Sequence, residues 1–255
     1  MKIKNMKVRN IKKLDVNVFP SREEMGESAG KDIENKIIEL LQFKPEIRMI
    51  FAAAPSQNEV LSYLANSGKI EWNRITAFHM DEYIGLDNSA SQLFSVYLND
   101  RLFGKVNLKK VYLIDGNSSL EEEIASYSAL ITEAPIDIVC LGIGENGHIA
   151  FNDPPVADFN DPQIIKKVKL DKSCRAQQVN EGCFANLEDV PKKALTLTIP
   201  VIMGADYLFC VVPGSSKHEA VYNTLNGPVS TLCPASVLKN HPNCRFYFDK
   251  DAYGS

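Results

Sequence analysis

The amino-acid sequence predicts one α/β domain over residues 1–255, with a doubly wound, mostly parallel sheet and helices on both faces. The first observation is that strand-like and helix-like segments alternate along the chain. The second is IDIVCLGIG (136–144), an apolar run with almost no alternation, which is typical of a parallel strand covered on both faces. The third is a length of 255 residues, 45% of them hydrophobic, with no linker between two parts.

The amino-terminal half supplies strands and helices in turn. Ser21–Glu24 has the pattern of a capping box, and apolar residues recur at helical spacing after it. The apolar run at 47–54 predicts a buried strand, and a second capping box at 56–59 predicts a helix that ends near Ala65. The next expected elements are a strand at 75–80, a helix at 92–103, a strand at 109–114 and a helix at 119–131.

The carboxyl-terminal half continues the alternation after a less regular middle. The runs ALTLTI and DYLFCVV predict strands, a helix follows from about Ser216, and RFYFD predicts a last strand. In doubly wound sheets, ligands bind beyond the carboxyl ends of the strands. The polar residues at the expected strand ends are therefore the candidates for a site, and they lie at 55–57, 81–83, 144–148 and 213–217.

Composition and charge exclude several classes of protein. A net charge of −4 argues against a nucleic-acid partner, whereas a small phosphorylated ligand needs only a local cluster of donors. The basic amino terminus lacks the apolar region of a secretory signal, and no apolar run approaches a membrane span. The six cysteines are scattered, so we expect buried, reduced thiols, a cytoplasmic protein and no bound zinc.

The stretch LGIGENGHIAFNDPP (141–155) contains the glycine spacing of a dinucleotide-binding turn. It fails as such a turn, because two prolines follow within eight residues and no full helix can form there. Gly147 and its neighbours instead allow close approach to a ligand and present His148 at the edge of the sheet. We predict that His148 is catalytic, with Asn146 and Asp153 nearby, and that no metal is bound, because one histidine stands alone there.

The other histidines receive structural interpretations from their context. His79 lies within an expected strand and should pack on it. We expect His218 and His241 to be surface residues.

Asp81 and Glu82 follow the strand expected at 75–80. Adjacent acids at the edge of a cleft repel each other, which tends to raise a pKa. Asp81 is a candidate base for moving a proton between adjacent carbons, as in enediol isomerases. Glu82 is a candidate substrate-binding residue that would orient Asp81 or cap a helix. The alternative is that Asp81 is an ordinary turn or capping residue.

Lys217 follows Gly214-Ser215-Ser216 where a helix is expected to begin. Free N–H groups, the helix dipole and an ammonium group together form an anion site, so Lys217 is a candidate phosphate ligand. Ser56 and Gln57, in the turn after Pro55, belong to the same candidate site. The alternative is that Lys217 is simply solvated.

Four stretches together, FHMDEYIGL, LGIGENGHIAFNDPP, ALTLTIP and VVPGSSK, resemble the glucosamine-6-phosphate deaminase (isomerase) family, from about Arg48 to the carboxyl terminus. The resemblance implies the Rossmann-like sheet shared with 6-phosphogluconolactonases. It also implies conversion of glucosamine 6-phosphate and water to fructose 6-phosphate and ammonia, without a metal or organic cofactor. By position, Asp81 would move the proton between C2 and C1, His148 would open the sugar ring, and Lys217 would hold the phosphate.

The chain departs from the family pattern at several positions. The family usually has Asp where this chain has Asn146, and Glu where it has Asp153. We hypothesise that Asp153, together with Glu145, supplies the missing charge beside His148. The usual phosphate turn is replaced by Ala53-Ala54-Pro55-Ser56-Gln57, and an expected arginine has no counterpart, although Arg175 is nearby. A different sugar phosphate therefore stays open as the substrate.

Two other functions stay open at this point. A lactonase-like hydrolase would use His148 to activate water and would not need Asp81. A non-catalytic sugar-phosphate sensor would bind without turnover, and Asn146 favours that alternative. The expected partner in every case is a small sugar phosphate, and the chain could form a homo-oligomer.

Overall fold

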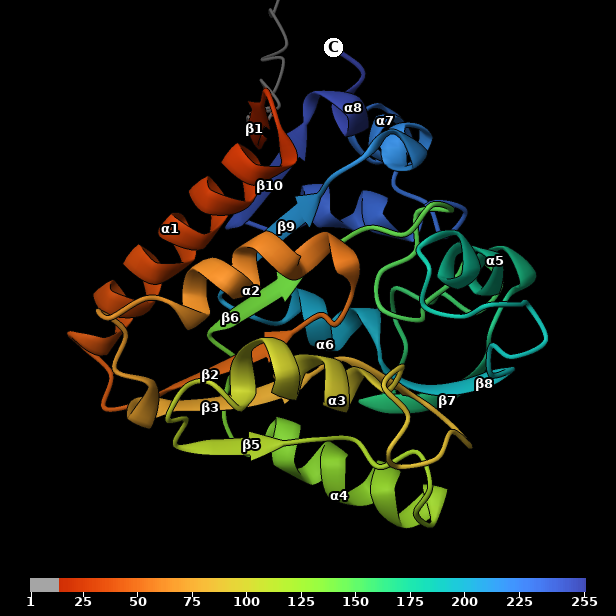
Figure 1. Ribbon diagram of the computed structural model, residues 1–255, viewed down its shortest axis with the longest axis horizontal. Coiled ribbons are helices and arrows are strands. Elements are labelled where there is room, and N and C mark those ends of the chain that lie inside the picture. Colours follow the sequence, from red (N-terminus) through yellow and green to blue (C-terminus); the bar gives the residue numbers. More distant parts are fainter. Residues whose placement is uncertain (1–13) are drawn as a thin grey trace, which may run out of the picture.

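The computed structural model describes residues 14–255 (Figure 1). The basic amino-terminal stretch lies outside these residues, so its interpretation stays a prediction. Within the described chain, seven parallel strands form the central sheet in the order β1-β10-β9-β6-β2-β3-β5. These strands are β1 (Asp15–Phe19), β2 (Ile47–Phe51), β3 (Ile75–His79), β5 (Lys110–Tyr112), β6 (Ile138–Leu141), β9 (Tyr207–Val212) and β10 (Cys244–Asp249).

Helices cover both faces of this sheet, so the predicted doubly wound α/β architecture is confirmed (Figure 1). The α-helices are α1 (Arg22–Leu41), α2 (Asn58–Ala65), α3 (Phe94–Leu98), α4 (Leu120–Thr132), α5 (Lys172–Asn180), α6 (Ile199–Met203), α7 (His218–Asn226) and α8 (Lys250–Tyr253). Short 3-10 turns precede α2 at Pro55–Gln57 and α7 at Ser215–Lys217.

Two hydrophobic cores lie on opposite faces of the sheet because successive side chains of a strand point to opposite sides. In β6, Ile138 and Cys140 belong to the core that includes α1 and α2, whereas Val139 and Leu141 belong to the core that includes α4, α6 and α7. This division explains why IDIVCLGIG reads as apolar without alternation.

A second sheet was not expected from the sequence. It contains three antiparallel strands in the order β4-β8-β7, formed by β4 (Asp81–Tyr83), β8 (Lys193–Leu197) and β7 (Ile165–Lys169). The run ALTLTI is thus a strand, but it pairs with Asp81–Tyr83 and not with the central sheet. As a result, Asp81 is the first residue of strand β4 and not a turn or capping residue, which was the alternative interpretation.

Of the two predicted capping boxes, the first is confirmed at its cap residue, Ser21, and the second is wrong. Ser21 caps α1, since its hydroxyl accepts a hydrogen bond from the N–H of Glu24 at 3.2 Å. Ser56 does not cap α2, because Pro55 starts a 3-10 turn that places Ser56 inside the turn. Glu59, the other member of the expected box, forms a 2.7 Å ion pair with Arg22.

The histidine and cysteine predictions are confirmed except at His241, Cys183 and Cys233. His79 is buried in β3 and accepts a hydrogen bond from the N–H of Ile114 at 2.7 Å, and His218 is exposed. His241 is buried, which contradicts the expected surface position; its Nε2 lies 2.8 Å from the carbonyl oxygen of Ala205. All six cysteines are free thiols, although Cys183 and Cys233 are only partly buried.

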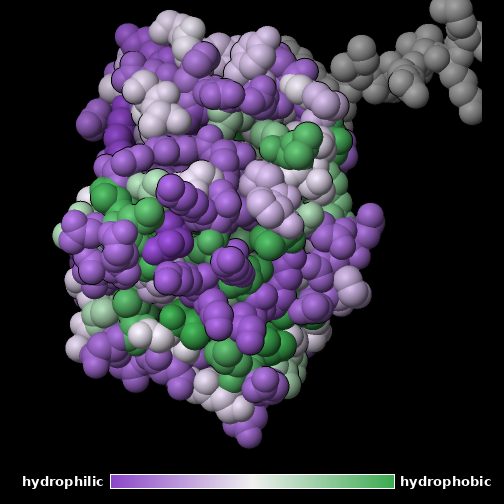
Figure 2. All heavy atoms as spheres, turned by 90° about the vertical axis from the view of Figure 1, so that its right-hand side faces the viewer, coloured by the Kyte–Doolittle hydropathy of each residue, from purple (hydrophilic) through white to green (hydrophobic). Residues whose placement is uncertain are grey.

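The surface around α5 is mostly hydrophilic. Figure 2 shows this side of the molecule, where hydrophobic residues form separate groups among hydrophilic ones. Such a distribution is typical of a surface that meets water. None of the helices between residues 14 and 255 has the length and apolar character needed to cross a membrane.

Candidate active site

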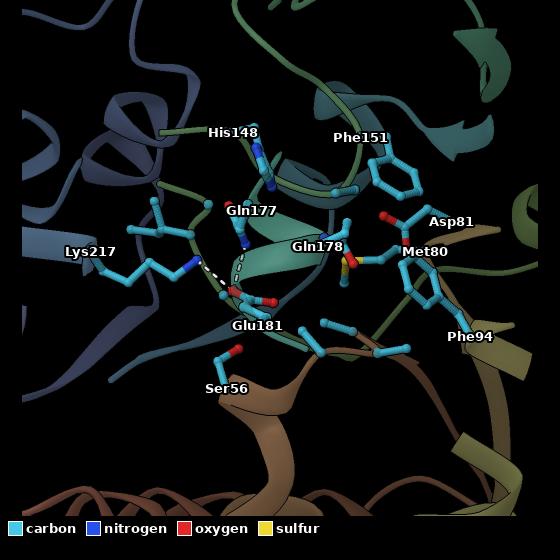
Figure 3. A pocket seen from close by; sticks show the side chains of 17 residues that line it. Ser56, Met80, Asp81, Phe94, His148, Phe151, Gln177, Gln178, Glu181 and Lys217 are labelled. Carbon is cyan, nitrogen blue, oxygen red and sulfur yellow. Dashed lines mark hydrogen bonds and ion pairs between the residues drawn. The ribbon is translucent and has the colours of Figure 1, made fainter. Parts of the chain in front are cut away.

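A pocket of about 520 Å³ opens beyond the carboxyl ends of β2, β3, β6 and β9, where the sequence placed the candidate site (Figure 3). The pocket brings together four of the predicted residues, Ser56, Asp81, His148 and Lys217. The remaining side chains of its lining come from Met80, Phe94, Ala150, Phe151, Gln177, Gln178 and Glu181, among others.

Asp81 is a buried carboxylate that faces the pocket from β4. Pairing with Thr196 of β8 fixes its backbone. Burial raises the pKa of Asp81 well above its ordinary value, and the nearby Glu82 charge raises this pKa further. Within residues 14–255, its carboxylate has no hydrogen-bond or ion-pair partner, so it can react with a ligand in the pocket.

Glu82 points away from the pocket, because successive side chains of β4 alternate in direction. Its carboxylate accepts hydrogen bonds from the N–H groups of Tyr83, Phe94 and Ser95 at 2.9, 3.1 and 2.9 Å. Two of these donors lie at the start of α3 (Phe94–Leu98). Glu82 therefore caps that helix, one of the two roles predicted for it, and does not line the pocket as a binding residue.

The glycine loop after β6 turns tightly without forming a helix, as predicted. Gly147 has φ +82°, and Ala150 adopts φ 50°, a left-handed conformation that costs free energy for a residue with a side chain. A Cβ at Gly144 would lie 2.0 Å from Cε1 of His148. Gly144 is therefore required for the position of the His148 ring. Gly147 itself packs on Cys233 and does not line the pocket.

Asn146 and Asp153 orient the imidazole of His148 through contacts with its Nδ1. Nδ1 of His148 lies 2.7 Å from Oδ1 of Asn146 and 3.1 Å from Oδ1 of Asp153. The Asn146 amide also donates to Asp153 at 2.9 Å. Both partners of Nδ1 are acceptors, so Nδ1 carries a proton and Nε2 is the nitrogen that serves the pocket.

Asp153 supplies a negative charge to this group. Burial alone would raise its pKa, but hydrogen bonds from His148 and Asn146 outweigh burial, and the pKa of Asp153 lies below its ordinary value. Glu145, which we expected to assist, forms no ion pair with His148 in the described chain. Its backbone N–H donates to the side-chain oxygen of Gln177 at 2.8 Å.

His148, Asp153 and Cys174 are close enough to hold a metal ion, since their ligand atoms lie within 4.8 Å of one another. The chemistry of the set favours hydrogen bonding. Burial, reinforced by the Asp153 charge, raises the pKa of the Cys174 thiol, and a protonated thiol is a poor metal ligand. The His148 nitrogen on this side already has two acceptors.

Lys217 is buried at the opposite end of the pocket from Asp81 (Figure 3). Gly214 begins the turn that leads to it, with φ +93° and an N–H that donates to the carboxylate of Asp249. Nζ of Lys217 lies 3.0 Å from Oε1 of Glu181. Lys217, which we predicted to bind the phosphate, is therefore in the pocket, but the carboxylate of Glu181 already pairs with it.

The two residues predicted after Pro55 have different positions. Ser56 lines the pocket. Gln57 is buried, and its amide donates to the carbonyl oxygens of Leu141 at 3.5 Å and Val211 at 3.2 Å. Gln57 thus joins the ends of β6 and β9 and does not face the pocket as a binding residue.

Three polar residues of the pocket were missed by the sequence analysis, Gln177, Gln178 and Glu181 from the end of α5 and the residues after it. The apolar periodicity that identifies other helices is absent from CRAQQVNEG. The available signal was the density of polar side chains in this run. Arg175, the arginine nearest to the position expected from the family, donates to backbone carbonyls of Leu187 and Val190 and does not reach the pocket.

Residues 20–246 match the model of a protein family described as glucosamine-6-phosphate isomerases/6-phosphogluconolactonase. The chain is 35% identical over 240 residues to glucosamine-6-phosphate deaminases of Bacillus thuringiensis (strain Al Hakam) and Bacillus cereus (strain AH820). These alignments cover 94% of this chain and 88% of each relative.

Solved structures show the same fold. A monomeric glucosamine-6-phosphate deaminase superposes with a TM-score of 0.85 at 30% identity, covering 94% of this chain and 99% of that protein. A 6-phosphogluconolactonase from Thermotoga maritima gives a TM-score of 0.76 at 20% identity, covering 93% of this chain and 100% of that protein. The second likeness concerns the fold alone.

Proposed function

The chain belongs to the family of glucosamine-6-phosphate isomerases and 6-phosphogluconolactonases, and on that premise we propose that it deaminates an amino-sugar phosphate. The proposed reaction converts glucosamine 6-phosphate and water to fructose 6-phosphate and ammonia. The observation that carries the proposal is the presence of two proton-transfer groups, Asp81 and His148, in one pocket. Neither a lactonase nor a sensor requires both.

The first step is opening of the sugar ring by His148. The hydrogen bonds at Nδ1 leave Nε2 as a proton acceptor on the pocket side. Nε2 takes the proton of the C1 hydroxyl and passes it to the ring oxygen, which breaks the C1–O bond and gives the open-chain aldehyde. The imidazolium that forms in between is stabilised by the carboxylate of Asp153.

The second step is the transfer of a proton from C2 to C1 by Asp81. The carboxylate removes the C2 proton, which gives an enolate with the amino group on C2. Asp81 then returns the proton to C1, and one proton of the amino group passes to the oxygen on C1. A raised pKa makes Asp81 a stronger base once it is ionised, as this step requires. The product is an imine at C2.

Water completes the reaction, which accounts for the hydrolase character that accompanies the isomerisation. It adds to C2 of the imine, the C–N bond breaks, and ammonia leaves with a ketone at C2. Every step is a proton transfer or an addition of water, so the residues of this chain supply the acids and bases that are needed. Lys217 and Ser56 would hold the phosphate end of the sugar.

The test is to measure ammonia and fructose 6-phosphate released from glucosamine 6-phosphate, with Asp81→Asn as the control. Turnover that is lost in Asp81→Asn supports the deaminase. Hydrolysis of 6-phosphogluconolactone that survives Asp81→Asn would support the lactonase alternative. Binding of glucosamine 6-phosphate without ammonia release would support the sensor.

The cellular setting and the assembly state are parts of the same proposal. A cytoplasmic location is supported by six free cysteines, which an oxidising compartment disfavours. The sequence left homo-oligomerisation open, while one solved relative is described as monomeric. Light scattering of the purified chain across a range of concentrations distinguishes a monomer from an oligomer.

A further inference from the structure

The ion pair between Lys217 and Glu181 determines the charge at one end of the pocket. Both side chains are mostly buried, with exposed fractions of 6% and 17%. The amide of Gln177 also donates to Oε1 of Glu181 at 2.8 Å, as the dashed lines in Figure 3 show. The positive charge of the Lys217 ammonium group is therefore balanced by Glu181 in the absence of a ligand.

No second permanent cation compensates for this pairing among the described residues that line the pocket. Arg22 pairs with Glu59, and Arg175 is bound to backbone carbonyls. A phosphate group carries close to two negative charges at neutral pH and is bound by charged donors in most sites. With Glu181 in place, this end of the pocket offers such a group no net positive charge.

Glu181 also has an unused acceptor. Its Oε2 is buried and has no hydrogen-bond partner within the described part of the chain. A buried carboxylate oxygen without a donor is costly, and a hydroxyl group of a ligand would satisfy it. Gln178 and Ser56 line the same region and suit a hydroxyl group equally well.

We propose that Glu181 is a specificity-determining residue: it competes with the ligand's phosphate for Lys217 and reduces the preference for phosphorylated over unphosphorylated sugars. The inference rests on the proposed function for the orientation of the sugar, with its reacting carbons at Asp81 and His148. It adds that phosphate binding must break the Lys217–Glu181 pair, whereas a hydroxyl group can bind with the pair intact.

The experiment compares the affinities for glucitol 6-phosphate and glucitol, two probes that cannot react, by calorimetry on the full chain. Glu181→Gln keeps the size of the side chain and removes its charge. We expect it to tighten binding of glucitol 6-phosphate at least tenfold and to change glucitol binding much less. The matched control is Glu188→Gln, which changes the net charge equally at an exposed position.

The outcomes separate this inference from the proposed reaction. A phosphate preference that is the same in Glu181→Gln and in the unmodified chain overturns the inference, even where glucosamine 6-phosphate is deaminated. A preference that rises in Glu181→Gln supports it, even where no sugar is turned over. Where deamination occurs, the effect should appear as a lower KM for glucosamine 6-phosphate and not as a higher kcat.

Discussion

Asp81 and Asp153 are both buried aspartates, yet their surroundings shift their pKa values in opposite directions. Asp81 has no donor among the described residues, so burial raises its pKa. Asp153 receives hydrogen bonds from His148 and Asn146, which lower its pKa despite burial. The two carboxylates therefore suit different tasks, a base for Asp81 and a permanent charge for Asp153.

Replacing Asp81 should lower the activity and raise the stability of the folded chain. We expect Asp81→Asn to lower deamination by about 10²–10⁴-fold, since the base is lost. The raised pKa means that ionised Asp81 destabilises the folded chain as pH rises through the folded-state pKa. Asp81→Asn should then be more stable than the unmodified chain at pH 8.

Thermal unfolding at two pH values checks this expectation. Near the ordinary aspartate pKa of 3.8, Asp81 is protonated in the folded chain and the stability difference should shrink. An Asp81→Asn variant that is less stable at pH 8 would contradict the argument, since a stabilising role for the ionised carboxylate would then be required.

The negative charge beside His148 should be effective at position 153 or at position 146. We expect Asp153→Asn to lower turnover about 10²-fold or more, because two neutral amides stabilise an imidazolium poorly. Adding Asn146→Asp to that variant should restore most of the activity, since one carboxylate and one amide are again present. Steady-state kinetics of the two variants measures the rescue.

The single substitution Asn146→Asp is the control for this swap. It places a second carboxylate against Asp153, at the position where the Asn146 amide now donates at 2.9 Å. We expect reduced activity at high pH, where both acids are ionised and repel each other. An equal loss in Asp153→Asn and in the double variant would refute the idea that the charge is interchangeable.

Sequence reasoning reached Asp81, His148 and Lys217 because each follows a recognisable strand or precedes a recognisable helix. It missed Gln177, Gln178 and Glu181 because they end a helix without an apolar stripe. It wrongly expected Gln57 and Glu82 to face the ligand. Adjacent residues of a turn or strand point in different directions, and the sequence does not say which one faces the ligand.

Among the elements, the glycine loop between β6 and β7 leaves no room for a side chain at Gly144. We expect Gly144→Ala to lower turnover at least about 100-fold, because the new Cβ would overlap the His148 ring and displace it. Gly68→Ala is the matched control, since a Cβ there meets nothing within 4 Å. Kinetics and thermal unfolding of both variants test whether the loss arises from the ring position or from unfolding.

Six of the seven strands of the central sheet were predicted from apolar runs, whereas β1 was missed because its residues alternate between polar and apolar and are only partly buried. The smaller sheet was not predictable, since β4 has only three residues and pairs with β8, which is far away in the sequence. The other partner of β8, strand β7, contains three lysines in five residues, and nothing in that composition indicates an antiparallel pairing. Non-local pairing of short strands leaves little trace in local sequence patterns.

At the scale of the whole molecule, buried His79 should make stability sensitive to acid. Burial lowers the pKa of His79 to about 3 from an ordinary value of 6.5. The contribution of neutral His79 to the free energy of unfolding is fully present above pH 6.5. This contribution is lost as the pH falls toward 3, by up to about 1.4 kcal/mol per pH unit.

His79→Gln should remove this part of the acid sensitivity while keeping an acceptor for the N–H of Ile114. We expect the stability advantage of the unmodified chain over His79→Gln to shrink as the pH falls from 7 to 4. Chemical denaturation measures this difference. His218→Gln, at an exposed position, is the control and should follow the unmodified chain. A constant difference between the unmodified chain and His79→Gln would contradict the assigned cause.

The segment from β7 to β8 carries Gln177, Gln178 and Glu181 as one continuous stretch of chain, whereas Asp81 and His148 belong to other parts of it. Selection can therefore act on ligand choice and on proton transfer separately. A relative could acquire a new substrate by exchanging one contiguous piece of gene, and the acid–base pair would be inherited unchanged. Chimeras that exchange only residues 177–181 between members of this family leave Thr196, the partner of Asp81, in place and offer a route to new sugar specificities.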